Sequence, residues 1–313
     1  MRSDRHIHKK KKRRLLKIFL TILGILVMGA GVYGYSVYHS INKAADTMHE
    51  PIPQHQTSKR LKAVSLDKKD PFSVLILGVD ERKNDRGRSD TMILAAVNPQ
   101  KQSVQLLSIP RDTRTEIVGK GTEDKINHAY AFGGVPMSIA TVEHFLDIPV
   151  DYYIKVNMEG LKDIVDAVNG VTVHNDLNFS YGGESFPKGT LHLNGEQALK
   201  YSRMRYEDPQ GDFGRQLRQR QILEGILNKG MDVSSLWQYG DVLNALQKNV
   251  KTNLTMDEIM KIEKNYKAAR NHIHQNEIKG EGTKINGVYY YIVSDAEKQR
   301  LSQLFKDQLN LNE

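Results

Sequence analysis

Arginines dominate one window of this sequence, and their number and spacing are typical of a site that binds an anion such as a phosphate. The turn Gly211-Asp212-Phe213-Gly214 opens a segment with helical periodicity, and five arginines lie within 18 residues around it: Arg203, Arg205, Arg215, Arg218 and Arg220. A guanidinium group offers forked donors that match phosphate oxygens, and a helix N-terminus adds backbone N–H groups. An arginine-rich solvent face is the alternative, but other solvent faces of this chain use lysine and this window contains none.

The spacing within this window assigns its side chains to faces. Arg203 and Arg205 share one side if the chain is extended there, because successive side chains of a strand alternate. Arg215 and Gln219 are four residues apart and share one face of the expected helix. The window therefore predicts two sets of polar side chains that could meet one anion.

Two aspartates follow and precede strand-like segments further toward the N-terminus. Asp80 comes directly after the apolar run 72–79, and Asp90, with Arg88 close by, comes just before the run 92–97. Ligands gather at strand ends in open α/β sheets, and carboxylates without cysteine or paired histidines suit magnesium or manganese rather than zinc. Taken alone, this segment favours an ordinary polar loop with solvated ion pairs.

A further arginine stands at the end of the next strand-like segment. In Ser108-Ile109-Pro110-Arg111-Asp112, the proline stops the hydrogen-bond ladder, and an arginine at such a corner often contacts an anion. As an isolated tripeptide this is weak support. No P-loop, Gly-x-Ser-x-Gly elbow or zincin motif is present, and the absence of cysteine excludes thiol catalysis.

The elements that must position these residues form an α/β pattern. The runs 72–79, 92–97 and 104–109 predict strands, the last two joined as a hairpin by the turn 98–102. Helices are predicted at 136–146 and 158–168, and strands at 152–156 and 171–174. Further helices are predicted at 194–205, 215–229, 236–246, 256–269 and 295–309, the last with Asp295 as its N-cap, and a strand at 288–293.

The N-terminal region predicts a membrane anchor. Residues 1–17 carry nine basic side chains and one acidic one, which accounts for the whole net charge of +8. Residues 18–38 contain no charged side chain and are long enough to span a bilayer as an uncleaved signal anchor. The basic block places residues 1–17 in the cytoplasm and the rest of the chain outside. Residues 39–69 are predicted to be an extracytoplasmic stalk without sustained periodicity, and residues 70–313 one globular domain.

The motifs, taken together and in this order, resemble the LytR–CpsA–Psr family of bacterial envelope proteins. They are LILGVDER at 75–82, RSDTM at 88–92, SIPRD at 108–112, KINHAY at 125–130, NGEQALKYSRMR at 194–205 and GDFGRQLRQRQ at 211–221. The resemblance implies a three-layer α/β/α fold with a central mixed sheet and a hydrophobic cleft for a polyprenyl chain. It implies transfer of an undecaprenyl-pyrophosphate-linked glycopolymer, such as wall teichoic acid, onto peptidoglycan in a Gram-positive bacterium.

The resemblance also implies roles for individual residues. Asp80 and Asp90 match magnesium-associated aspartates of the family, and Arg111 matches the arginine held critical for activity. The pyrophosphate contacts are expected from Arg88, Arg203, Arg205, Arg215 and Gln219, together with Arg111. If a general base is needed, a carboxylate such as Asp80, Asp90 or Asp212 is a better candidate than an arginine.

Two other functions remain open at the level of sequence. A membrane-anchored transcriptional regulator would use the basic N-terminal block on nucleic acid, but that block is only 17 residues long and is separated from the domain by the predicted span. Residues 18–313 carry 36 basic and 36 acidic side chains (45 − 9 and 37 − 1), so the chain after residue 17 provides no net field for a polyanion, and no nucleic-acid partner is expected. A relative that binds the lipid-linked polymer without transferring it is the second alternative.

Overall fold

The computed structural model describes residues 28, 31–52, 59–60, 62–81, 86–158, 160–231 and 239–311. The chain divides into two compact units, Met1–Ala44 and Ala45–Glu313. Residues 39–48, expected to be irregular, are helical. No helix within the described ranges is long and apolar enough to cross a membrane. The basic block at 1–17 and most of the predicted span at 18–38 lie outside these ranges.

A mixed sheet of six strands forms the centre of the second unit, in the order β11-β6-β1-β2-β3-β12. β2 is antiparallel to both β1 and β3, while β6 is parallel to β1 and β12 is parallel to β3. The predicted β2–β3 hairpin is therefore confirmed. The strands are β1 (Phe72–Val79), β2 (Ser89–Asn98), β3 (Ser103–Ser108), β6 (Tyr152–Asn157), β11 (Val250–Thr252) and β12 (His272–Glu277).

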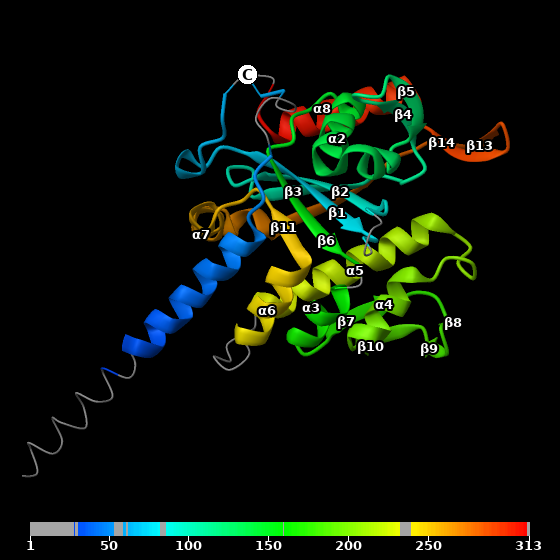
Figure 1. Ribbon diagram of the computed structural model, residues 1–313. Coiled ribbons are helices and arrows are strands. Elements are labelled where there is room, and N and C mark those ends of the chain that lie inside the picture. Colours follow the sequence, from blue (N-terminus) through cyan, green and yellow to red (C-terminus); the bar gives the residue numbers. More distant parts are fainter. Residues whose placement is uncertain are drawn as a thin grey trace, which may run out of the picture. The chain divides into compact units, whose positions relative to one another are not determined.

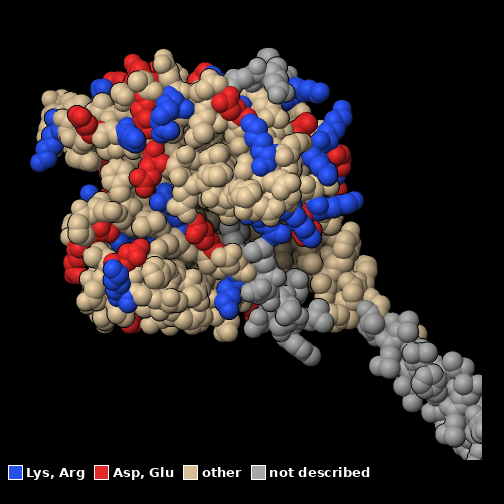
Figure 2. Space-filling model, turned by 180° about the vertical axis from the view of Figure 1, so that it is seen from behind, with Lys and Arg blue, Asp and Glu red and all other residues tan. Residues whose placement is uncertain are grey.

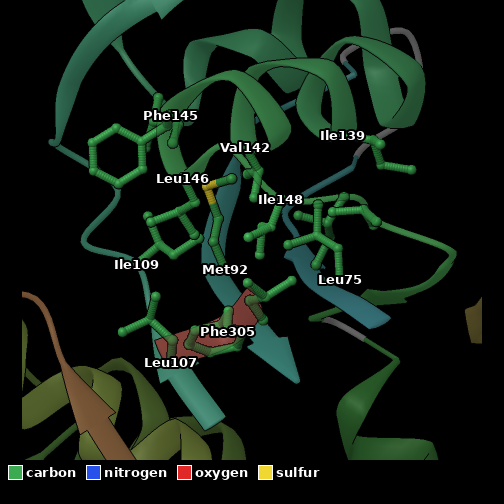
Figure 3. Close-up of a cluster of buried hydrophobic side chains, with 14 of the residues drawn as sticks. Leu75, Met92, Leu107, Ile109, Ile139, Val142, Phe145, Leu146, Ile148 and Phe305 are labelled. Atoms are coloured by element: carbon green, nitrogen blue, oxygen red, sulfur yellow. The ribbon is translucent and has the colours of Figure 1, made fainter. Parts of the chain in front are cut away.

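The central strands of the sheet lie between two helical layers, as Figure 1 shows. Alternate residues of β1 point to opposite faces, so Leu75 and Leu77 pack on one side with α2 (His128–Leu146) and α8 (Asp295–Gln308). Figure 3 shows this core, in which Phe145 of α2 and Phe305 of α8 lie with the strand residues. Val74 packs on the other side, in the cluster that contains Tyr266 beyond the end of α7 (Met256–Asn265). The continuous apolar run of β1 reflects burial on both faces.

Among the described residues, the predicted helices begin within three residues of the observed starts, except for α2, and the N-cap of α8 also differs. α2 begins at His128 rather than at residue 136, with a break at Gly134 (φ 65°, ψ −149°) that lets Pro136 open the second part of the helix. The N-cap of α8 is Ser294, whose side chain accepts a hydrogen bond from Glu297 N, and Asp295 is the first helical residue. Serine and aspartate are both favoured as N-caps, and aspartate is also favoured in the first turn. The predicted N-cap is therefore one position too late.

A smaller lobe beside the sheet carries the arginine window. Its core joins β7 (Val171–Asn175) and β10 (Gly189–Leu193) to α3 (Leu161–Ala167), α4 (Gly195–Arg203) and α5 (Asp212–Met231). A capping box between Asn194 and Gln197 starts α4. The remaining elements are η1 (Leu66–Lys68), β4 (Arg114–Ile117), β5 (Thr122–Lys125), β8 (Phe179–Tyr181), β9 (Glu184–Phe186), α6 (Tyr239–Asn249), η2 (Lys267–Asn271), β13 (Glu281–Ile285) and β14 (Val288–Ile292).

Candidate active site

One end of the central sheet gathers the predicted polar residues from three strands. Because β2 runs antiparallel to β1 and β3, the residues that open β2 lie beside those that follow the other two strands. Asp80 follows β1, Asp90 lies at the start of β2, and Arg111 follows β3. The chain returns closely here: a Cβ on Gly87, whose φ is +66°, would lie 2.1 Å from the carbonyl oxygen of Asp80. Glycine is therefore required beside Asp80.

Arg111 is the centre of the charge cluster at this end. Its Nη1 donates to Oδ1 of Asp90 at 2.6 Å, and its Nε lies 3.7 Å from Oδ1 of Asp212 and 3.8 Å from Oδ2 of Asp112. The Nε is buried and has no hydrogen-bond partner within the described ranges. Burial alone would lower the pKa of Arg111, but Asp90 and Asp212 outweigh it and raise this pKa above its ordinary value. The guanidinium is therefore a permanent cation held among three carboxylates.

α5 adds a second buried arginine to the cluster. Arg215 donates from Nε to Oδ1 of Asp212 at 2.9 Å and from Nη2 to the backbone oxygen of Asp90 at 3.2 Å. It thereby ties the start of α5 to the start of β2. Asp212 is partly buried, which by itself raises its pKa, but Arg215 and Arg111 more than compensate, so that the pKa of Asp212 lies below its ordinary value. Asp212 is therefore an ionised partner of two arginines and a weak proton acceptor.

Gln219 lies one turn further along α5 and faces the sheet. Its Oε1 accepts a hydrogen bond from the Thr91 hydroxyl at 2.7 Å, and its side chain is buried. Arg215 and Gln219 thus share the face of α5 that the four-residue spacing predicted.

The other predicted phosphate contacts lie further out. Arg205 is partly exposed, with its Nε 3.9 Å from Oδ1 of Asp212, so it lies at the rim of the same cluster. Arg203 ends α4 and is exposed, and Arg88 is exposed just before β2, where its carbonyl accepts from Asp80 N. The structure thus brings Arg111, Arg205, Arg215, Asp90 and Asp212 together.

Two arginines of the window are structural. Arg218 is buried and donates to the backbone oxygens of Tyr201 and Met204 and to Oδ2 of Asp208. Arg220 donates to the Ser108 hydroxyl at 2.6 Å, and burial lowers its pKa. Spacing alone does not separate these arginines from Arg215, whereas the family resemblance indicates only Arg215 of the three as a pyrophosphate contact.

Two carboxylates of the cluster make ion pairs that the sequence did not indicate. Asp212, expected only as a possible base, holds Arg111 and Arg215. Asp112 pairs with Lys125 Nζ at 2.7 Å and lies beside Arg111. The sequence signal for Asp212 is its place in the first turn of a helix, where an acidic side chain is favoured.

A narrow apolar cavity opens next to Gln219, between the sheet and α5. It is lined by Ile76, Gly78, Thr91, Val156, Met158, Leu161, Gln219 and Leu223, and its volume is about 20 Å³. That is room for roughly one water molecule. The arginine cluster thus adjoins a small apolar space through Thr91 and Gln219.

The residues at the sheet end also suit a hard cation. Magnesium usually takes one or two protein carboxylates and completes its shell with water and substrate phosphates. Asp80 and Asp90 follow this pattern. Among the residues that the structure describes, no group of three or more His, Cys, Asp and Glu side chains could hold a metal by itself. The donor set therefore fits a magnesium ion shared with a phosphate ligand.

Comparison with known proteins gives the same picture over the whole chain. Bacillus subtilis (strain 168) has a protein named polyisoprenyl-teichoic acid–peptidoglycan teichoic acid transferase TagU, which is 54% identical over 307 residues, 98% of this chain and 98% of that protein. The crystal structure of B. subtilis TagU matches with a TM-score of 0.64 at 51% identity, covering 77% of this chain and 97% of the solved one.

Two other solved structures are similar to this chain. A structure of TagT bound to LIIa-WTA has a TM-score of 0.70 at 30% identity, covering 84% of this chain and all of that one. An Enterococcus faecalis structure described as a transcriptional regulator has a TM-score of 0.71 at 39% identity, covering 80% and 91% of the two chains. The family model described as LytR_cpsA_psr matches residues 35–307. With the motifs, the fold and the arginine cluster in agreement, this chain belongs to the LytR–CpsA–Psr family.

Proposed function

We propose that this protein transfers teichoic acid from a polyprenyl pyrophosphate carrier to a hydroxyl group of peptidoglycan. The observation that carries the proposal is the cluster of Arg111 and Arg215, held by Asp90 and Asp212 and adjoining an apolar cavity. A lipid pyrophosphate has these two parts, an anion and a hydrocarbon chain. The name of the B. subtilis relative and the LIIa-WTA ligand of the TagT structure support this substrate class.

The reaction is a phosphoryl-group transfer. Such a reaction depends more on electrostatic stabilisation of the transferred group than on covalent catalysis by the protein. The acceptor hydroxyl oxygen attacks the phosphorus that bears the polymer and forms a new P–O bond. The bond from that phosphorus to the bridging oxygen breaks, its electron pair leaves with polyprenyl phosphate, and the hydroxyl proton passes to solvent or a base. Arg111 and Arg215 would hold the non-bridging oxygens, whose charge grows during transfer.

Asp80 and Asp90 would hold a magnesium ion, with manganese as the alternative. Such an ion would neutralise charge on the phosphate oxygens. Asp90 also orients Arg111 through its Oδ1. The two aspartates therefore act on the same ligand, one of them through the arginine as well.

The apolar cavity would receive the first part of the lipid chain. Its walls enclose only about 20 Å³, so Met158 and Leu223 would have to move apart to admit an isoprenoid, such as the undecaprenyl chain. Methionine adapts to such changes because its side chain is unbranched and flexible.

The proposed reaction requires the domain at the outer face of a cell membrane. Residues 18–38 would be the span and residues 1–17 the cytoplasmic end, with the sheet domain outside a Gram-positive cell. The uncharged run and the basic block that precedes it support this orientation.

A direct assay tests the proposal. The full-length chain in detergent is incubated with a polyprenyl-pyrophosphate-linked teichoic acid precursor, peptidoglycan oligomers and Mg²⁺. We expect a covalent polymer–peptidoglycan product and stoichiometric polyprenyl phosphate, both detected by mass spectrometry. Donor binding without product under these conditions would favour the binding-only alternative.

A cavity variant adds a second arm to this assay. Leu223→Trp fills the apolar space beside Gln219 and should weaken donor binding. Met260→Trp, at an exposed position of α7, is the matched control and should leave donor binding unchanged.

A further inference from the structure

The β13–β14 hairpin is fastened directly beside the arginine cluster. Tyr291 N donates to the backbone oxygen of Asp112 at 2.9 Å, and Thr113 and Tyr291 form an isolated bridge. The Tyr291 ring packs edge-on against Phe213, the second residue of α5, with ring centres 5.4 Å apart. Figure 1 shows the rest of the hairpin projecting from the body of the domain. The base of the hairpin is therefore fixed beside the arginine cluster, and the rest of the hairpin extends away from the domain.

Tyr289 lies on the site-facing side of this hairpin. Side chains alternate along β14, so Tyr289 shares a side with Tyr291, and Val288 lies on the opposite side. The ring of Tyr289 rests on Gly282 of β13, where a Cβ would lie 2.8 Å from the ring. Burial and the carboxylates of Asp112 and Asp212 raise the pKa of Tyr289. The ring is thus held near the cluster as a neutral hydroxyl donor.

Tyr289 and Phe213 keep open surface even though both are held in place. Tyr289 is 41% exposed and Phe213 is 37% exposed. An aromatic ring supported on one side and open on the other can stack with another flat or apolar face. The two rings border the cluster on the side where α5 begins.

The residues along α5 set a direction for the proposed reaction. Phe213, Arg215, Gln219 and Leu223 follow one another along the helix, which at 1.5 Å per residue places the aromatic end about 15 Å from the cavity end. In an in-line transfer the attacking and leaving oxygens lie on opposite sides of the phosphorus. If the lipid leaves at the Leu223 end, the attacking hydroxyl arrives from the Phe213 end.

We propose that Tyr289 and Phe213 form the acceptor subsite and bind a sugar ring of the peptidoglycan glycan strand. The inference rests on the proposed function for its direction. The C–H faces of a pyranose match the negative faces of aromatic rings, and the Tyr289 hydroxyl can donate to a sugar oxygen. Peptidoglycan carries carboxylates on its peptides, and Lys284, paired in register with Tyr289, and Arg205 supply nearby positive charge.

The test compares variants of residues that lie on opposite faces of β14. Tyr289→Ala should raise the KM for peptidoglycan oligomers roughly tenfold, as expected for a lost stacking contact, while the KM for the lipid donor changes less than about twofold. Tyr289→Phe keeps the ring and should stay within about threefold of the parent for both. Val288→Ala removes an equally exposed apolar side chain from the opposite face and should change neither KM.

A second measurement separates this inference from the proposed function. Binding of a lipid-free peptidoglycan tetrasaccharide to the full-length chain is measured without donor, and Tyr289→Ala should weaken it by a similar factor. If the parent catalyses no transfer but binds the tetrasaccharide, and Tyr289→Ala loses this binding, the result would support the subsite and overturn the transferase proposal. Unchanged acceptor binding in Tyr289→Ala, or a raised KM for the donor alone, would overturn the subsite. Equal melting temperatures of the variants ensure that folding does not account for the result.

Discussion

At the scale of single residues, the site depends on the shape of the guanidinium group as much as on its charge. Arg111 uses Nη1 for Asp90, and within the described ranges its Nε has no hydrogen bond. Arg215 uses two nitrogens to join Asp212 to the backbone of β2. The planar guanidinium can donate to a carboxylate on one edge and to an anion on another. A lysine ammonium is a compact point charge and cannot replace this arrangement.

Arg111→Lys should therefore slow transfer with little effect on folding. Loss of one preorganised donor to a transition state costs roughly 10²–10³ in rate in other enzymes. Donor affinity should fall much less, because Arg215 and the apolar cavity remain. The measurement is transfer rate, donor affinity and melting temperature for Arg111→Lys and for Arg300→Lys, a remote control on α8. A transfer rate within about twofold of the parent would remove Arg111 from the chemistry.

Asp80→Asn tests the cation site with the least disturbance to Arg111. Removing one carboxylate ligand should raise the Mg²⁺ concentration needed for half-maximal activity, because the ion then keeps only Asp90 from the protein. Thermal stability without added metal should stay unchanged. In Asp90→Asn the effect should be larger, since the ion pair with Arg111 is lost too. An unfolded Asp80→Asn protein would instead indicate a structural role.

At the scale of elements, Arg218 joins α5 to the segment that follows α4. Its buried guanidinium donates hydrogen bonds to the backbone oxygens of Tyr201 and Met204 and to the carboxylate of Asp208. Removing one partner of a buried pair leaves the other charge without compensation, which costs about 3–5 kcal/mol. Arg218→Ala should lower the free energy of unfolding by about this amount. Arg205→Ala, at a partly exposed position, should cost about 0.5 kcal/mol or less in denaturant titrations.

Glu143 connects α2 with the entry to β6 and gives the domain a dependence on pH. Its Oε1 accepts from Val150 N at 2.8 Å, and burial raises the pKa of Glu143 to about 7 from an ordinary 4.5. The folded state therefore holds the proton more tightly. Its contribution to stability is complete below pH 4.5 and is lost as pH rises through about 7.

Glu143→Gln should remove this dependence, because the amide keeps the acceptor and cannot ionise. The free energy of unfolding should rise relative to the parent by about 3 kcal/mol at pH 8, and by little at pH 4. Urea titrations at the two pH values measure the difference. An equal change at both would show that ionisation of Glu143 does not contribute.

At the scale of the whole molecule, charge is separated along the chain. The nine basic residues of positions 1–17 carry the entire excess, while positions 18–313 balance at 36 of each sign. On the face drawn in Figure 2, basic and acidic side chains are interspersed over the domain. The domain therefore offers specific contacts to an anion at one cluster and no general attraction.

This separation predicts the orientation of the chain in a membrane. A reporter that is active only outside the cytoplasm, fused after Glu313, should be active in a Gram-positive host. Replacing the six basic residues at 9–14 by neutral ones should lower that activity. Strong signal from a cytoplasm-only reporter at the same position would contradict the orientation.

The sequence by itself determined the parts of this protein that rest on local patterns. Apolar runs and the turn at 98–102 predicted β1 and the β2–β3 hairpin, and the structure places Asp80, Asp90 and Arg111, which stand at the ends of these runs, at one end of the sheet. The Gly-Asp-x-Gly turn before the arginines predicted α5 with Arg215 and Gln219 on one face. These features depend on residues a few positions apart, so a linear pattern records them.

Only the tertiary structure shows that Arg218 and Arg220 hold the fold while Arg215 joins the cluster around Arg111. Arg215 meets the backbone of Asp90 across 125 positions of sequence, and Arg220 meets Ser108 across 112. The buried roles of Arg218 and Arg220, the apolar cavity beside Gln219 and the place of the β13–β14 hairpin beside Arg111 arise in the same way. Such contacts depend on how distant segments pack, and the physical cost of burying a charge is met by partners that no local spacing reveals.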